Sequence, residues 1–158
     1  RKSIPAIRTA VEQLARCCGE PLCAEGDEVF LFPTPEQLCG LTEAQLTGCG
    51  LGYRTRYIQH AAAQAAAHTL DLDALAVLPD NALFSRLLTL DGVGKKVANC
   101  VCLFGYGRTA MAPIDVWIQR LIDEEFGGRD PFPAYGQQAG IVQQYLFYYK
   151  RSISTQKK

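Results

Sequence analysis

The sequence has no excess of charge of either sign, because 16 lysines and arginines balance 16 aspartates and glutamates among 158 residues. Such a chain lacks the positive field that covers the surface of many nucleic-acid-binding proteins, so any contact with a nucleic acid must be local. A hydrophobic fraction of 48% is enough for one sizeable core. This composition argues against a disordered or fibrous chain.

Long apolar runs are also missing. No segment approaches the roughly 20 apolar residues that cross a bilayer, and residues 1–20 contain no apolar signal core. We therefore expect a soluble, cytoplasmic protein without a membrane partner.

Paired cysteine knuckles are absent, although the chain has seven cysteines. An odd number of irregularly spaced cysteines is typical of reduced thiols in a cytosol rather than of a disulfide framework. Cys17, Cys18 and Cys23 lack the second CxxC pair of a structural zinc site. His60 and His68 lie eight residues apart, too far for a shared metal without a third ligand. We expect these two histidines to be exposed or to cap a helix.

What the sequence does contain is a series of helix signals. Ser3, followed by Pro5, predicts a helix that ends near Gly19. Its apolar stripe is expected to consist of Ile7, Val11, Leu14 and Ala15. Residues 20–33 resemble a connecting loop in which only Val29–Phe32 is extended.

Shorter helices follow. Thr34 and Thr42 predict two helix starts, with Gly40 and Gly48 at the corresponding ends. The alanine-rich segment 59–70 predicts a helix with a slim face that another helix can approach closely.

The second half of the chain reads as helices joined by tight turns. Asp80 is expected to cap a helix over 81–90, and 96–107 is expected to form the next helix. The buried positions of that helix are expected to be Val97, Val101 and Phe104. Asp115 would cap a further helix, and 139–153 the last. No strand alternation exceeds about four residues, so the predicted fold is all-α, as one domain or two closely packed helical lobes.

The stretch LLTLDGVGKKVANC carries the first chemical motif. Its hairpin, residues 90–94, has glycines where the backbone turns sharply or approaches a ligand. Free amides of Val93, Gly94 and Lys95 at a helix start would favour a phosphate. An ordinary tight turn is the alternative, because GxG alone is a weak signal.

Lys96 and Asp115 are the candidate reactive groups. Lys96 lies near a helix start and precedes an apolar stretch, surroundings that disfavour a charged amine and favour a nucleophile. A solvated lysine that contacts phosphate is the alternative. Asp115, in PIDVW, would be held ionised by amides and would face a developing positive charge, unless it serves only as a helix cap.

The combination of LDGVGKKVANCVCLF and PIDVW resembles the helix-hairpin-helix (HhH-GPD) DNA glycosylases, in particular the 8-oxoguanine glycosylase and abasic-site lyase branch. Residues 50–58 resemble the family's segment at the orphaned cytosine, and 139–147 resemble its base-pocket helix. The resemblance implies a glycosylase core over 1–158, with the hairpin at about 81–106 and C-terminal helices at about 115–152. It also implies two helical lobes with the cleft between them.

The resemblance further implies a bifunctional enzyme that excises 8-oxoguanine from double-stranded DNA and nicks the strand by β-elimination. Lys96 would form a Schiff base with the deoxyribose, and Asp115 would stabilise the sugar cation. The implied base pocket consists of Cys100, Gln143 and Phe147. The implied DNA contacts are Tyr53 and Arg54 at the opposite cytosine, and Val93, Gly94 and Lys95 at the hairpin. A sodium or potassium ion would bind the carbonyls of Leu88, Leu90 and Val93.

The sequence departs from the family pattern in several features. Trp117 stands where mammalian members have a histidine. No cysteine follows Cys102, so no iron-sulfur cluster and no other cofactor is expected. The family's N-terminal domain is expected to be missing from a fragment of this length, and the protein is expected to be a monomer associated with a bacterial-type nucleoid.

Three other interpretations stay open at this point. A lysine glycosylase for oxidised pyrimidines, or a general abasic-site lyase, would keep Lys96 and Asp115 but alter the pocket. A non-catalytic helix-hairpin-helix module would need only the hairpin amides and Lys95, although its lack of net positive charge argues against it. A helical interaction module would leave the spacing of Lys96, Asp115 and Gln143 unexplained.

Overall fold

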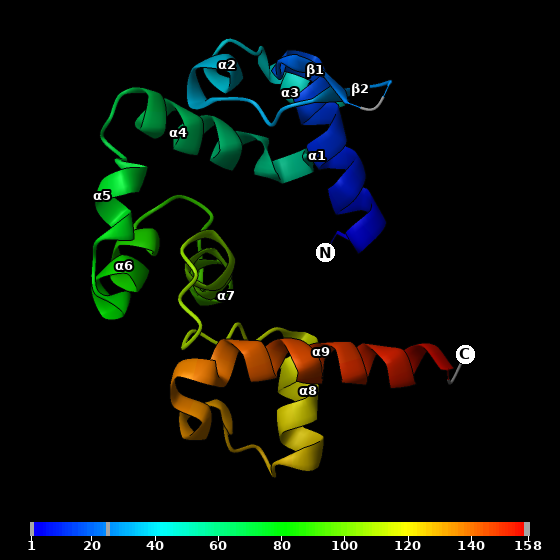
Figure 1. Ribbon diagram of the computed structural model, residues 1–158, viewed down its shortest axis with the longest axis vertical. Coiled ribbons are helices and arrows are strands. Elements are labelled where there is room, and N and C mark those ends of the chain that lie inside the picture. Colours follow the sequence, from blue (N-terminus) through cyan, green and yellow to red (C-terminus); the bar gives the residue numbers. More distant parts are fainter. Residues whose placement is uncertain (1, 25, 157–158) are drawn as a thin grey trace. The chain divides into compact units, whose positions relative to one another are not determined.

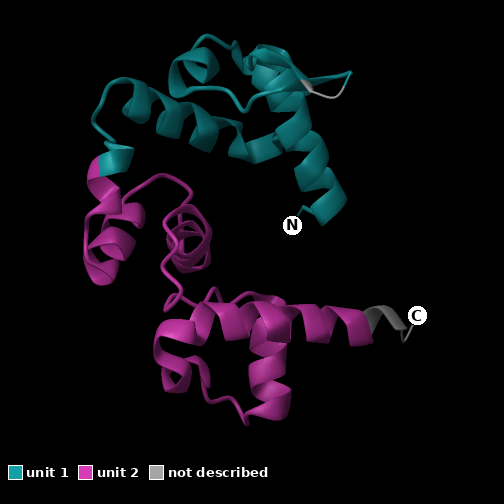
Figure 2. Ribbon diagram, in the orientation of Figure 1, with its two compact units in different colours: residues 1–73 teal, residues 74–158 magenta. Residues whose placement is uncertain are grey.

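The computed structural model describes residues 2–24 and 26–156. The chain forms two compact units, residues 1–73 and 74–158 (Figure 2). The first unit contains α1 (Ile4–Cys18), β1 (Pro21–Ala24), β2 (Asp27–Phe30), α2 (Pro35–Cys39), α3 (Glu43–Gly48), the 3-10 turn η1 (Gly52–Arg54) and α4 (Thr55–Ala66) (Figure 1). Helix α5 (Leu72–Ala76) spans the boundary between the units. The second unit continues with α6 (Asp80–Leu87), α7 (Lys95–Cys100), the π-helical turn η2 (Val101–Gly105), α8 (Val116–Glu125), the 3-10 segment η3 (Phe132–Gln138) and α9 (Ala139–Gln156).

The prediction of a mainly helical fold is confirmed. In the part of the chain that the structure covers, no helix is both long and apolar enough to span a bilayer. The predicted caps of the first unit are also confirmed. The Ser3 side chain accepts a hydrogen bond from the Ala6 amide, and Thr34 and Thr42 each form a reciprocal capping box.

The core of the first unit lies among α1, α2, α3 and α4. Its buried residues are Ala10, Leu14, Leu38, Leu46, Cys49, Leu51 and Ala62. Helix α2 packs against α4, as expected for an alanine-rich helix that lets a neighbour approach closely. The predicted stripe of α1 is wrong in part, because Ile7 and Val11 are exposed whereas Ala10, Leu14 and Ala15 are buried.

Residues 20–33 were predicted to form a connecting loop with only Val29–Phe32 extended, and this prediction is wrong in part because the segment contains two strands. Strands β1 and β2 pair as an antiparallel hairpin in which Leu22 lies opposite Val29 and Ala24 lies opposite Asp27. Gly26 has φ +92°, a conformation that glycine adopts without the Cβ penalty. Leu22 and Val29 are both exposed. A hairpin without a buried face does not require the alternation of apolar and polar residues that identifies a strand in a sequence.

The second unit has a separate apolar cluster formed by α8, η3 and α9. Its buried residues are Ile118, Ile122, Phe132 and Ala139, with Ala112, Ile114, Leu146 and Phe147 packed against them. Helix α8 contacts α9 (Figure 1). This cluster fixes the two helices that carry Asp115 and Gln143.

Two details of the predicted hairpin helices are wrong. Asp80 is the first residue of α6 rather than its cap, and Pro79 occupies the cap position without a side-chain hydrogen bond. Val97 and Phe104, which were expected to be buried, are 40% and 64% exposed. The inward positions are Ala98 and Cys102, one turn apart. Cys102 already lies in the π-helical turn η2, where the spacing of an α-helix no longer identifies the buried residues.

Arg108 connects the hairpin to the segment that precedes α6. Its Nη2 atom donates to the carbonyl oxygens of Ala76 and Leu78 at 2.6 and 3.1 Å. Its Nε atom lies 3.5 Å from Asp80 Oδ1, an ion pair without hydrogen-bond geometry. Asp80 therefore does not cap α6 as predicted, because its carboxylate is paired with Arg108.

Arg108→Ala is expected to lower the free energy of unfolding by about 2–3 kcal/mol, because hydrogen bonds from a charged donor are lost and two carbonyls lose their partner. Arg8→Ala is the matched control, since Arg8 pairs with Glu12 on an exposed surface of α1. That change should cost only about 0.3–0.5 kcal/mol. Urea unfolding followed by circular dichroism measures both, and equal effects would contradict an anchoring role for Arg108.

Candidate active site

The turn between α6 and α7 is the helix-hairpin-helix element. Gly92 has φ +76°, which confirms the expected sharp turn. Gly94 is the cap of α7 with extended backbone at φ −92°, and a Cβ there would meet nothing within 4 Å. Gly94 thus leaves the start of α7 open to a large ligand.

The hairpin amides differ from the prediction at one position. The Val93 amide donates to the Leu90 carbonyl oxygen at 3.1 Å, so it closes the turn and is not available to a phosphate. Within residues 26–156, the amides of Gly94 and Lys95 donate no hydrogen bond. These two amides, with the Lys95 side chain, remain as the candidate phosphate contacts.

Lys96 is the second residue of α7, and its side chain is exposed. The expectation that apolar surroundings enclose the Lys96 amine is therefore wrong. Ala98 faces the core, and a residue two positions away lies on nearly the opposite side of a helix. The Lys96 amine is accordingly accessible to a ligand placed over the first turn of α7.

Asp115 is confirmed as the cap of α8. Its Oδ1 atom accepts hydrogen bonds from the amides of Trp117 and Ile118 at 2.9 and 3.0 Å. The carboxylate is half-buried, and the positive end of the helix dipole favours a negative charge at this place. Both hydrogen bonds are made by one oxygen, and the other oxygen of the carboxylate accepts none from the described residues.

Cys100 ends α7 and is half-buried, and the π-helical turn begins directly after it. The Tyr106 amide donates to the Val101 carbonyl oxygen at 3.2 Å, five residues back. Isolated π turns are often found at functional sites. Cys102, inside this turn, is fully buried. Burial, reinforced by the Asp80 carboxylate, raises the pKa of the Cys102 thiol, which keeps it protonated and unreactive near neutral pH.

Gln143 and Phe147 lie one turn apart on α9. Gln143 is only 3% exposed, and its Oε1 atom accepts a hydrogen bond from Gln144 Nε2. In the described part of α9 its own Nε2 atom donates to no protein acceptor, so the amide can still donate to a ligand. Phe147 packs against the apolar cluster of this unit, and the Arg151 guanidinium lies 5.8 Å from the ring centroid.

In the second unit, the helices near Asp115 and Phe147 share one apolar cluster. Ile114, next to Asp115, and Phe147 pack against the same apolar cluster. Considering only the residues described, no hydrogen bond or ion pair joins Lys96, Asp115 and Gln143 to one another. A substrate that contacts all three would supply that connection.

Tyr53 and Arg54 lie in the first unit at η1, and they belong to a larger group. The Arg54 guanidinium lies 4.4 Å from the centroid of the Tyr53 ring, which is 67% exposed. Tyr57 meets Tyr53 edge to face at 6.2 Å, and Arg56 lies 4.8 Å from the Tyr57 ring. Alternating cations and aromatic rings suit a nucleic-acid base and its backbone. The sequence reasoning missed Arg56 and Tyr57, although the pattern YRTRY already contains them.

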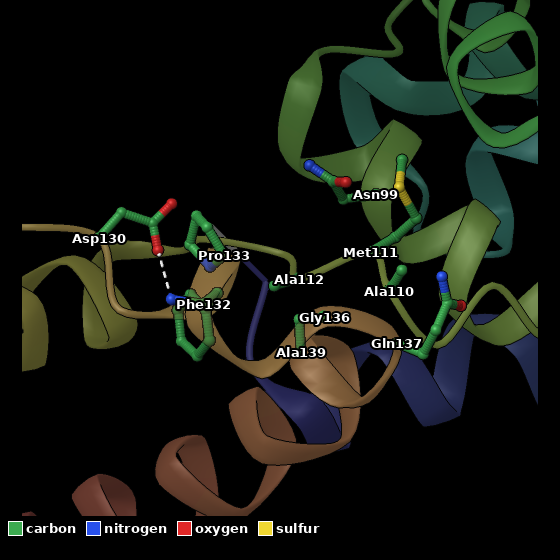
Figure 3. Close-up of a pocket in the computed structure, with 10 residues that line it drawn as sticks. All are labelled: Asn99, Ala110, Met111, Ala112, Asp130, Phe132, Pro133, Gly136, Gln137 and Ala139. Atoms are coloured by element: carbon green, nitrogen blue, oxygen red, sulfur yellow. Dashed lines mark hydrogen bonds between the residues drawn. The ribbon is translucent and has the colours of Figure 1, made fainter.

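A pocket of about 330 Å³ in the second unit was also missed (Figure 3). Its lining residues are Asn99, Ala110, Met111, Ala112, Asp130, Phe132, Pro133, Gly136, Gln137 and Ala139. The Asp130 carboxylate accepts a hydrogen bond from the Phe132 amide at 2.9 Å and fixes the loop (Figure 3). Gly136 has φ +51°. In the sequence this turn is indicated only by an isolated glycine. None of the predicted base-pocket residues lines this pocket.

Metal and cofactor sites were predicted only at the hairpin. Among the described residues, no three His, Cys, Asp or Glu side chains are grouped so that they could hold a metal ion. All seven cysteines are free thiols, and both histidines are exposed. Leu88 is the residue after α6, and Leu90 and Val93 lie in the hairpin turn, where the Leu90 oxygen already accepts the Val93 amide.

Comparison with known proteins explains this arrangement. Residues 2–135 match the family described as the HhH-GPD superfamily of base excision DNA repair proteins. The chain belongs to this superfamily. In the structure the helix-hairpin-helix element and Asp115 both lie in the second unit.

Individual HhH-GPD members extend the comparison. A probable N-glycosylase/DNA lyase of Methanothermobacter thermautotrophicus is 29% identical over 170 residues, covering 90% of this chain and 54% of that protein. The structure of MBOgg1 in complex with a low-affinity DNA ligand is 32% identical, with a TM-score of 0.89, and the match covers 98% of this chain and 56% of that one. The Clostridium acetobutylicum 8-oxoguanine glycosylase/lyase, in complex with double-stranded DNA containing cytosine opposite 8-oxoguanine, is 28% identical with a TM-score of 0.89 and the same coverage. The chain thus spans about half the length of these HhH-GPD relatives.

Proposed function

We propose that this chain is the catalytic core of a DNA glycosylase that excises 8-oxoguanine and also cleaves the resulting abasic site. The observation that carries the proposal is the likeness, over 98% of the chain, to an 8-oxoguanine glycosylase/lyase in complex with DNA. The accessible amine of Lys96 and the anchored carboxylate of Asp115 support it, because both lie in the second unit.

The base would be recognised by side chains of the second unit. A base inside a duplex cannot reach an active-site group, so it must first be flipped out of the stack. The buried amide of Gln143 can donate hydrogen bonds to the edge of the base. Cys100 and Phe147 would contact its two faces, and this contact would offset the cost of unstacking.

Lys96 would carry the covalent chemistry. Its neutral amine attacks C1′ of the deoxyribose, the bond from C1′ to the base breaks, and the base leaves with the bonding electron pair and takes up a proton. The nitrogen, now bound to C1′, gives up a proton, the C1′–O4′ bond breaks, O4′ takes up a proton as the sugar ring opens, and an imine forms between Nζ and C1′. Loss of a proton from C2′ then expels the 3′ phosphate, which is the β-elimination step. Asp115 would stabilise the positive charge that develops on the sugar.

DNA outside the flipped nucleotide would be held at two places. The amides of Gly94 and Lys95, with the Lys95 side chain, would bind a backbone phosphate at the start of α7. In the first unit, Tyr53 and Arg54 would contact the cytosine opposite the lesion. Local contacts of this kind suit a chain with no net charge.

The same proposal includes a monovalent cation at the hairpin. Carbonyl oxygens of Leu88, Leu90 and Val93 form an all-oxygen donor set, and each carbonyl has two lone pairs. The Leu90 oxygen uses one of them for the Val93 amide and keeps one for the ion. A sodium or potassium ion would supply positive charge next to the phosphate.

Borohydride trapping tests the proposed function. The chain is incubated with three matched duplexes that contain 8-oxoguanine opposite cytosine, an abasic site opposite cytosine, or guanine opposite cytosine. A covalent adduct with the first two duplexes, and none with the third, is expected. Adducts with the abasic duplex alone would instead indicate a lyase or a glycosylase for another base. Binding without any adduct would indicate a non-catalytic DNA-binding module.

A further inference from the structure

Gly140, the second residue of α9, makes an unusually close contact with the segment that leads to Asp115. Its amide donates to the Thr109 carbonyl oxygen at 2.7 Å. A Cβ atom at this position would lie 2.5 Å from the Met111 carbonyl oxygen and 2.9 Å from the Thr109 carbonyl oxygen. It would also lie 2.8 Å from Leu103 Cδ1 in η2. Two of these neighbours are backbone atoms, so any side chain at residue 140 must displace main chain.

The contact faces the same side of α9 as the candidate base-recognising residues. Gly140, Gln143 and Phe147 follow the i, i+3, i+7 spacing that places residues on one helical face. At Gly140 this face meets Leu103, which lies three residues after Cys100. The position of α9 relative to α7 and η2 is therefore set within one turn of Gln143.

We propose that Gly140 is a positioning residue for base recognition, an inference that rests on the proposed function. The absence of a side chain lets α9 approach the 109–111 segment and η2 closely enough for Gln143 and Phe147 to face Cys100. The residue acts through these three side chains and touches no substrate. Gln143 meets the base edge, whereas an abasic site has no base, so a displacement of α9 affects excision more than reaction at a preformed abasic site.

Gly140→Ala is the direct test. A displacement of about 1 Å at a reacting group can cost on the order of 10²-fold in rate. We expect single-turnover excision of 8-oxoguanine to fall at least about tenfold relative to borohydride trapping at an abasic site. The ratio of the two rates on the same protein sample corrects for any unfolded fraction. In the Gln143→Ala background the same substitution should change that ratio little further, since the residue through which Gly140 acts is already gone.

Gly19→Ala is the matched control. A Cβ at Gly19 would lie 2.0 Å from the Leu31 carbonyl oxygen and 2.6 Å from the Ala15 carbonyl oxygen, so the crowding is at least as severe. Gly19 lies in the first unit and should leave the ratio unchanged even where it lowers the melting temperature.

Two results would overturn the inference. The first is an unchanged ratio in Gly140→Ala, and the second is loss of both reactions in parallel, which would make Gly140 a residue of general structural importance. Failure of the unsubstituted chain to trap either substrate would reject the proposed function itself.

Discussion

Lys96→Gln is expected to abolish the covalent adduct with both 8-oxoguanine and abasic-site duplexes. Glutamine keeps most of the side-chain length and its polarity but has no amine, so no imine can form. Nucleophilic catalysis is lost, and excision under single-turnover conditions should fall by at least about 10³-fold, a loss of the size seen when a covalent nucleophile is removed. Mass spectrometry of the borohydride-treated mixture measures the adduct.

Lys95→Gln is the matched control for this experiment. Lys95 and Lys96 are adjacent on the first turn of α7, and both side chains are exposed. The Lys95 change removes the same charge without removing the proposed nucleophile. It should weaken DNA binding, and more at low salt than at high salt, while the adduct still forms. An adduct that persists in Lys96→Gln and vanishes in Lys95→Gln would exchange the two roles.

Asp115→Asn is expected to lower the rate of excision by about 10²–10³-fold, the range found when a group that stabilises developing charge is removed. Asparagine caps a helix about as well as aspartate, so the hydrogen bonds to the Trp117 and Ile118 amides can be kept. The free energy of unfolding should therefore change little. Single-turnover excision and urea unfolding, measured on the same preparation, separate the two properties.

Asp115→Ala removes the cap together with the charge. It should add a loss of about 1 kcal/mol in the free energy of unfolding to the rate loss of the asparagine variant. A helix cap without catalytic function predicts the opposite pattern. In that case Asp115→Asn would excise normally, and Asp115→Ala would lose activity only in proportion to its unfolded fraction.

The sequence predicted the local features of the fold well. Caps at Ser3, Thr34, Thr42 and Asp115 were identified because each depends on a few neighbouring residues. The sharp turn at Gly92 was identified for the same reason. Hydrogen bonds over three or four residues leave a readable pattern in the chain.

Features that depend on distant residues were missed. Asp80 has the composition of a cap, but its carboxylate is turned toward Arg108, 28 positions along the chain. Phe104 lies in the π turn at Val101–Gly105 and is exposed, and no residue type marks such a turn. Strand β2 has no buried residue, so it shows no periodic alternation of apolar and polar side chains.

In the candidate site, too, local features were predicted and features that depend on distant residues were missed. Lys96 and Asp115 were named from their places at helix starts, and Gln143 was named from the resemblance to a family; the helices at these positions are present. The crowding at Gly140 could not have been read from the sequence, since it depends on carbonyl oxygens some thirty positions away. The Val93 amide was misjudged because a turn can close on itself within three residues.

The π turn after Cys100 has a consequence for insertions and deletions. A π turn holds one residue more than an α turn, so every residue beyond η2 is offset by one position relative to Lys96. Deleting a single residue from Val101–Gly105 would restore a regular helix and rotate the following backbone by about 100°. Arg108 would then point away from the Ala76 and Leu78 carbonyls. The number of residues between Lys96 and Asp115 is therefore a property of the fold, and this short stretch should tolerate substitutions far better than changes in length.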